Sequence, residues 1–250
     1  MSIINSFDLS SDSIFRPEHL AKPIEGFPDT LICIFTRYML NTFLQHHTCV
    51  TIGSMSDGRM IYETVYKNKP IAFFRTSIGA PPTVALLEEA IVLGARKILL
   101  FGSCGTIDKN ITESNIIIPT FAYRDEGTSY HYAPADAGDF IEVKTSGRTA
   151  EIFKEMGIPT VLGKTWTTDA IFRETRRNME ERRKAGCITV DMECAGVMAM
   201  AQFREIEAYQ FFYSADNLDS SEWERRTLGT LPANSKERLA KMALEVAVRL

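Results

Sequence analysis

The stretch Val190-Asp191-Met192-Glu193-Cys194-Ala195-Gly196 places two carboxylates around a methionine where a short apolar run gives way to a helical pattern. Residues 187–190 are typical of the end of a strand, and residues 195–203 are typical of an apolar helix. Asp191 and Glu193 therefore fall at the carboxyl end of a strand, where ligands bind in open α/β sheets. For either acid alone, the alternative is a helix cap at the positive end of the helix dipole.

Two further apolar runs end in small and polar residues. Phe101-Gly102-Ser103-Cys104-Gly105-Thr106 follows residues 97–100, and Phe212-Tyr213-Ser214-Ala215-Asp216-Asn217 follows residues 207–211. We interpret each as a strand that runs into a polar turn. The sequence thus predicts three strand ends that carry polar groups.

Short apolar runs alternate with helical patterns along the rest of the chain. Strands are expected near 31–35, 47–52, 60–66, 70–76, 97–101, 115–123, 159–166, 187–191 and 207–214, and helices near 37–46, 81–95, 146–157, 173–185, 193–204 and 233–249. This order predicts an α/β fold, a single domain with a mixed central β-sheet flanked by helices. Residues 1–30 are polar and contain three prolines, so we expect an N-terminal arm ahead of a domain at 31–250.

Composition excludes several classes of function. The 250 residues are 45% apolar and 24% charged with a net charge of −4, and the basic residues are dispersed, so no nucleic acid partner is expected. No apolar run approaches the roughly 20 residues that cross a bilayer, and the N-terminus has no signal pattern, so we expect a cytoplasmic protein without a membrane partner. The five cysteines lack metal-ligand spacing, and no metal site is predicted.

Taken in order, the three strand ends resemble the superfamily of nucleoside phosphorylases and nucleosidases, which contains purine nucleoside phosphorylase, uridine phosphorylase and methylthioadenosine nucleosidase. The resemblance runs from about Pro70 to the C-terminus and includes Ser77–Pro81, 83–94, Asp125–Tyr132 and Thr167–Ala170. It implies a three-layer α/β/α fold of the phosphorylase/hydrolase type and a small-molecule nucleoside as substrate. It also implies no cofactor, inorganic phosphate as co-substrate if the protein is a phosphorylase, and a homo-oligomer, either a dimer or a hexamer.

The resemblance assigns roles to the two ends that carry acids. Met192 and Glu193 match the ribose-binding pair, and an ionised carboxylate can accept hydrogen bonds from two adjacent sugar hydroxyls. Asp216 matches the aspartate of purine-cleaving members, where burial raises its proton affinity so that it can share a proton with the departing base. Arg225 or Arg226 would pair with it. A structural Asp that caps a turn is the alternative for Asp216.

The phosphate site departs from the family pattern. Gly102 and Ser103 can present backbone amides and a hydroxyl to an anion or a water molecule. The phosphorylases carry an arginine three residues before this serine, where this chain has Leu100. Replacement charge can come from three other arginines, namely Arg37, Arg59 and Arg75. For Arg75 the alternative is an edge-strand side chain that faces water.

The base-binding wall is expected to include residues that flank two of the strand ends. These are Trp166, Asp169, Ile171 and Phe172, together with Val190 and Asp191. The alternative for the aromatic residues among them is a place in the hydrophobic core. Position 175 is threonine, whereas uridine phosphorylases have at this position a glutamine that binds uracil. This difference favours a purine base.

Three functions remain open on the sequence. The first is cleavage of the N-glycosidic bond of a nucleoside, with a purine base expected, by phosphorolysis to free base and ribose 1-phosphate. The second is hydrolysis of the same bond, because the arginines that bind phosphate are missing. The third is a nucleoside-binding protein without catalytic activity.

Overall fold

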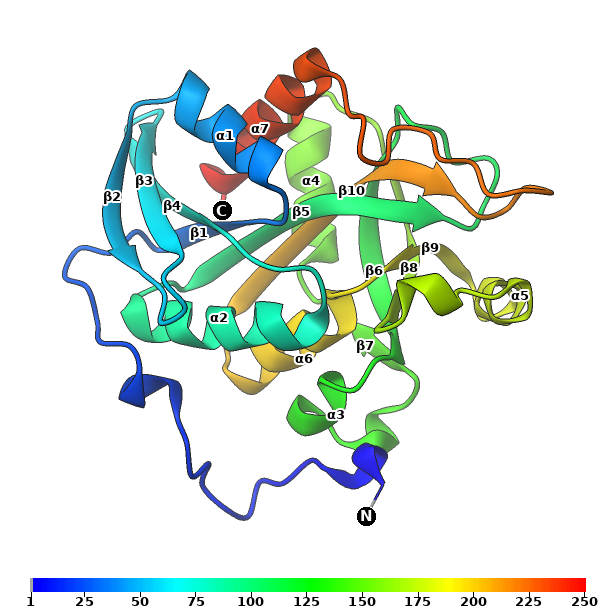
Figure 1. Cartoon of the computed structure of the whole chain (residues 1–250), viewed down its shortest axis with the longest axis horizontal. Helices are drawn as coiled ribbons and strands as arrows, with labels where there is room; N and C mark the ends of the chain where they lie inside the picture. The colour runs from blue at the N-terminus through cyan, green and yellow to red at the C-terminus, as the bar shows by residue number, and fades with distance from the viewer. Residues whose placement is uncertain (1) are drawn as a thin grey trace.

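The computed structural model describes residues 2–250, which form a central sheet covered by helices (Figure 1). The strands are β1 (Thr30–Ile34), β2 (Cys49–Ser54), β3 (Met60–Tyr66), β4 (Lys69–Arg75), β5 (Lys97–Thr106), β6 (Ile116–Asp125), β7 (Phe140–Glu142), β8 (Thr160–Thr168), β9 (Cys187–Asp191) and β10 (Glu207–Asn217). The α-helices are α1 (Arg37–His46), α2 (Ala80–Leu93), α3 (Ser129–Tyr132), α4 (Ser146–Glu155), α5 (Arg176–Lys184), α6 (Cys194–Phe203) and α7 (Ala233–Ala247).

The sheet is mixed, and part of it closes on itself. Strands β10, β6, β8, β9 and β5 follow one another, and β5 pairs back with β10 to complete a ring of five strands. From β5 the sheet continues outward through β1, β4, β3 and β2. Pairs such as β5 with β10 are parallel, whereas β5 with β9 and β6 with β10 are antiparallel. Closure removes the free edges of these five strands.

Helices cover both faces of the sheet, as the sequence predicts. Helices α2 and α6 pack on one face, and α1, α4 and α7 pack on the other (Figure 1). Alternation along each strand supplies both cores, because Leu31 and Cys33 point to the first face while Ile32 and Ile34 point to the second. The prediction of a single α/β domain with a mixed central sheet is confirmed.

The expected turns at 101–106 and 212–217 are wrong. Both segments continue as strand, because Phe212 pairs with Gly102 and the ladder runs on to Asn217 and Thr106. Small side chains do not prevent strand formation when a neighbouring strand offers its backbone groups. A β-bulge lies between Ser214 and Asp216, where the register shifts. A bulge re-aims the side chains that follow it.

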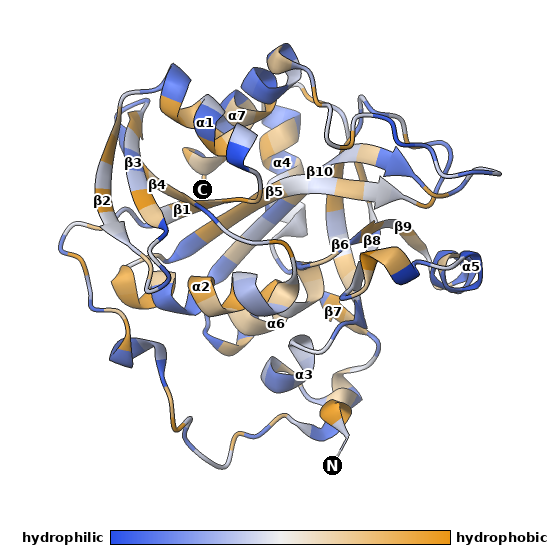
Figure 2. Cartoon of the chain, viewed as in Figure 1, coloured by the Kyte–Doolittle hydropathy of each residue, from blue (hydrophilic) through white to orange (hydrophobic). Residues whose placement is uncertain are grey.

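Some segments lie outside these layers. Residues 2–29, which precede β1, contain short 3₁₀ turns at Ile3–Asn5 and Pro17–His19, and this segment passes along the side of the molecule that carries α2, α6 and α3 (Figure 1). Helix α5 is hydrophilic over most of its surface and buries only Met179 (Figure 2). Within residues 2–250, no helix is both long enough and apolar enough to cross a membrane.

Candidate functional site

A cavity of about 150 Å³ opens where β5, β9 and β10 end. Four acidic residues line it, namely Glu174, Asp191, Glu193 and Asp216. No lysine, arginine or histidine lies among its lining residues in the described part of the chain. The cavity brings together the three strand ends that the sequence singles out, and its wall is strongly acidic.

Glu193 lies at the start of α6 and is buried. Its Oε1 accepts a hydrogen bond of 2.6 Å from the backbone N–H of Gly79, at the N-terminus of α2. Burial, together with the charge of Asp191, raises the pKa of Glu193 to about 8. A carboxylate has about four acceptor positions, so this one hydrogen bond leaves capacity for a ligand. Met192 lines the cavity beside it and is partly exposed.

Both carboxylate oxygens of Asp191 accept hydrogen bonds from other groups of the protein. Its Oδ1 accepts hydrogen bonds from the hydroxyls of Thr165 and Thr167, and its Oδ2 accepts from the backbone N–H groups of Glu193 and Cys194. Burial raises its pKa even though these four donors favour the ionised form. The capping role considered for this stretch fits Asp191, which fixes the start of α6 and thereby positions Glu193.

Asp216 reaches the same cavity from β10. Its Oδ2 accepts a hydrogen bond of 2.8 Å from Nε1 of Trp223, and burial raises its pKa against the opposing effects of Trp223 and Arg226. Gly105 on β5 makes room for it. A Cβ at position 105 would lie 2.8 Å from side-chain atoms of Leu218 and Val190 and 3.2 Å from Oδ1 of Asp216.

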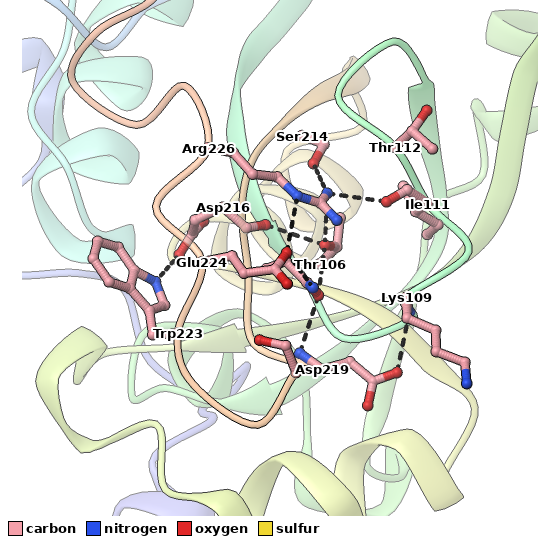
Figure 3. A network of polar contacts seen from close by, with 12 residues as sticks. Thr106, Lys109, Ile111, Thr112, Ser214, Asp216, Asp219, Trp223, Glu224 and Arg226 are labelled. Carbon is pink, nitrogen blue, oxygen red and sulfur yellow. Dashed lines mark hydrogen bonds and ion pairs between the residues drawn. The ribbon is translucent and has the colours of Figure 1, made fainter.

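The two arginines proposed as partners of Asp216 differ in position. Nη1 of Arg226 donates to the Ser214 hydroxyl at 2.8 Å and to the carbonyl of Ile111 at 3.0 Å, as Figure 3 shows. Arg225 is exposed, and its Nε donates to the carbonyl of Leu228. Neither side chain donates a hydrogen bond to Asp216 within residues 2–250. Arg226 acts on Asp216 through its charge, which favours the ionised form.

The three arginines proposed as replacements for phosphate-binding charge do not line the cavity. Arg37 is exposed at the first residue of α1. Arg59 is held by Asp57 and by the Ser77 hydroxyl. The half-buried side chain of Arg75 makes no hydrogen bond or ion pair within residues 2–250. Gly102 and Ser103 do belong to the cavity wall.

The expected base-binding residues divide into two groups. Ile171, Val190 and Asp191 line the cavity. Phe172 lines an adjoining cavity of about 470 Å³ that shares Ile171, Glu174, Asp216 and Leu228 with the first. Trp166 is buried in the core and donates to Asp125, and Asp169 accepts from the backbone N–H of Gly127. The structure does not bring these two side chains to the cavity lining.

Sequence reasoning missed three residues at the site. Glu174 lines both cavities, and its pKa is raised to about 8 by burial and by the charges of Asp216 and Asp191. Trp223 lines the adjoining cavity and bonds Asp216. Gln210 lies within the apolar run of β10 and lines the first cavity. A polar residue inside an apolar run was the signal available for Gln210.

The family model described as the phosphorylase superfamily matches residues 32–248. The chain belongs to this superfamily. Uridine phosphorylase of Escherichia coli (strain K12) is 27% identical over 154 residues, which cover 56% of this chain and 61% of that protein. A DeoD-type purine nucleoside phosphorylase of Buchnera aphidicola (strain Tuc7) is 23% identical over 213 residues, which cover 82% of this chain and 89% of that protein.

A solved structure of a purine nucleoside phosphorylase shares the fold. Purine nucleoside phosphorylase from Toxoplasma gondii, in complex with immucillin-H, superposes with a TM-score of 0.74 over 94% of each chain, at 20% identity. Among residues 2–250 there is no group of three or more His, Cys, Asp or Glu side chains arranged to hold a metal ion.

Proposed function

We propose that this protein cleaves the N-glycosidic bond of a nucleoside whose base is a purine. The observation that carries the proposal is that Glu193, which follows β9, and Asp216, near the end of β10, line one cavity beside β5, the strand that pairs with both β9 and β10. Relatives in the superfamily are named for the cleavage of purine nucleosides and of uridine. An acid with a raised pKa at the base end favours a purine, because a purine offers a ring nitrogen to protonate.

Glu193 and Asp216 have different roles in this proposal. Glu193 accepts hydrogen bonds from the sugar hydroxyls, and Met192 beside it packs on the sugar. Asp216, whose pKa is raised by burial, holds a proton for the base as the bond to the anomeric carbon breaks. Phe172 and Ile171 in the adjoining cavity supply apolar surface for the base.

For the nucleophile we favour water over phosphate. A phosphate dianion in this cavity would meet no lysine, arginine or histidine among the lining residues in the described part of the chain, since none of Arg37, Arg59 and Arg75 lines the wall. In the hydrolytic step the water oxygen bonds to C1′ while the bond from C1′ to the base breaks. The base leaves with the proton of Asp216, and the proton lost by the water returns to Asp216 through solvent.

Phosphorolysis is the second candidate, and two observations favour it. Gly102 and Ser103 lie in the cavity wall, where backbone amides and a hydroxyl can bind an anion. The relatives are named phosphorylases. In this case inorganic phosphate is the co-substrate, and a basic residue from a second copy of the chain in a dimer or hexamer completes the site.

The experiment that tests the proposal measures the release of free base from inosine, guanosine, adenosine, methylthioadenosine and uridine, each with and without inorganic phosphate. Base release at equal rates in both conditions, with free ribose as the product, supports hydrolysis. Release that requires phosphate and yields ribose 1-phosphate supports phosphorolysis instead.

A binding protein without activity is separated from an enzyme by Asp216→Ala. Binding alone requires no proton donor at the base, so a binder keeps its affinity for nucleoside and shows no turnover in either form. A catalyst loses rate with a smaller loss in binding.

A further inference from the structure

Gln210 is a buried amide without a partner at the cavity. Its side chain is 1% exposed, its Oε1 makes no hydrogen bond in the described residues, and it lines the cavity that holds Glu193 and Asp216. Its Nε2 also donates no hydrogen bond within residues 2–250. Buried polar groups are almost always hydrogen-bonded, so an orphaned one at a ligand site points to a missing ligand or water.

The strand neighbours of Gln210 offer it no polar partner. Alternation along β10 places Gln210 on the same face as Ala208 and Phe212, and its register partner across the parallel pair is Leu100 of β5. These neighbours are apolar. The group that satisfies the amide must therefore come from the cavity, because an unsatisfied buried amide destabilises the folded state.

The register also fixes where on the wall Gln210 lies. Leu100 comes two residues before Gly102 on β5, and Gln210 comes two residues before Phe212 on β10. Gln210 therefore lies deeper along the strands than Gly102, Ser103 and Asp216. A buried water molecule needs two to four polar partners, and the Gln210 amide offers both a donor and an acceptor.

We propose that the side-chain amide of Gln210 holds the water molecule that attacks the sugar; this inference rests on the hydrolytic function proposed above. An amide both donates and accepts, so it can bind a water molecule and aim one of its lone pairs. The Gln210 amide beside Leu100 is uncharged, so it can bind a neutral water molecule. It does not supply the positive charge that a phosphate dianion needs. Gln210 is thus a positioning residue for the nucleophile.

The test compares Gln210→Met with Gln202→Met, which makes the same change at an exposed residue of α6. Three quantities are measured: nucleoside turnover, calorimetric affinity for a C-nucleoside whose base is joined by a carbon–carbon bond that cannot be cleaved, and the thermal midpoint. For Gln210→Met we expect turnover to fall by about 100-fold, with the affinity for the C-nucleoside changed by less than about threefold. The thermal midpoint checks that both variants remain folded under the conditions of the assay.

Each other outcome overturns the inference. Unchanged turnover in Gln210→Met assigns Gln210 a structural role. If the affinity for the C-nucleoside falls as much as the turnover, Gln210 contacts the sugar instead of the nucleophile. Strictly phosphate-dependent turnover in the wild type removes the water nucleophile. A wild-type protein that binds the C-nucleoside but releases no base from any nucleoside overturns the proposed function itself, a result distinguishable from one confined to the variant.

Discussion

The indole Nε1 of Trp223 donates a hydrogen bond of 2.8 Å to Oδ2 of Asp216, while the nearby Arg226 directs its Nη1 to the hydroxyl of Ser214 (Figure 3). The group that directly bonds the proposed acid is therefore a neutral indole on a loop. Arg226 instead holds the bulged end of β10 in place.

Replacing Trp223 by phenylalanine is expected to raise the pKa of Asp216 further. The indole bonds the carboxylate and lowers its pKa, so its loss favours the protonated form. Because Asp216 must be protonated to give its proton to the base, the basic limb of the pH profile of kcat moves to higher pH. Steady-state rates from about pH 5 to about pH 10 measure this shift. An unmoved limb excludes Asp216 as the acid.

The variants Arg226→Met and Arg225→Met form a matched pair. Arg226 bonds Thr106, Ile111 and Ser214, so its loss leaves partly buried acceptors unpaired and is expected to lower the free energy of unfolding by about 1–3 kcal/mol. Arg225 is exposed, and its variant is expected to stay within about 0.5 kcal/mol of the wild type. Urea denaturation compares the two. Equal effects contradict the assignment of the structural role to Arg226 alone.

The variant Glu174→Gln tests the acidic wall through stability. The unfolded chain releases the Glu174 proton near its ordinary pKa of 4.5, while the folded protein keeps it to about pH 8. The folded state binds more protons in this window, so the unfolding free energy decreases as pH rises from about 4.5 to about 8 and then levels off. Glutamine removes this contribution, and the thermal midpoint of the variant should fall less across the window. Glu180→Gln, at an exposed residue of α5, is the control.

The variant Glu193→Gln tests the sugar contact. The buried carboxylate accepts from Gly79 N, and an amide oxygen at the same place can keep that bond. The amide accepts fewer hydrogen bonds than a carboxylate and adds donors. We expect kcat/KM to fall by roughly 10- to 100-fold for nucleosides, while the affinity for the free base stays unchanged. Equal losses for nucleoside and free base place Glu193 away from the sugar.

The variant Gly105→Ala tests how closely the strand ends approach one another. A Cβ there would lie 2.8 Å from Leu218 and Val190, so we expect a loss of about 1–3 kcal/mol in unfolding free energy and a lower kcat as Asp216 is displaced. Gly147→Ala in α4 is the control, because its Cβ meets nothing within 4 Å. Gly147 is the second residue of α4, so its alanine variant should keep or slightly increase the unfolding free energy, whereas Gly105→Ala should lower it.

More of the fold than of the site could be predicted from the sequence. Hydrophobic periodicity places β3 at residues 60–66 and α1 at residues 37–46, as the structure has them. The closure of β5 onto β10 could not be predicted, because alternation along a strand is the same in an open sheet and in a ring. The short β7 and α3 were missed because segments of three or four residues carry too little periodic pattern.

At the site, the sequence identified acidic residues at strand ends, where such residues are unusual. It could not show which hydrophobic residues pack in the core and which line the cavity. The cavity includes Glu193 and Asp216, which the sequence singles out. The same reasoning could not separate Trp166, which is buried in the core, from Phe172, which is exposed, because both are aromatic residues near one strand end. Glu174 was missed because a charged residue beside a run of arginines is typical of a solvated surface.

The ring of five strands has a consequence for motion. Strands β5, β9 and β10 carry the site and have partners on both sides, so their amide protons are expected to exchange with solvent as slowly as any in the molecule. The acids at the ends of β9 and β10 are then fixed relative to each other on the timescale of turnover. Residues 169–175 and 218–231 contribute Ile171, Glu174 and Leu228 to the cavity wall and lie outside the ring. We therefore expect the motion that admits ligand and releases product to occur in these segments, so that the rate of this motion sets an upper limit on turnover.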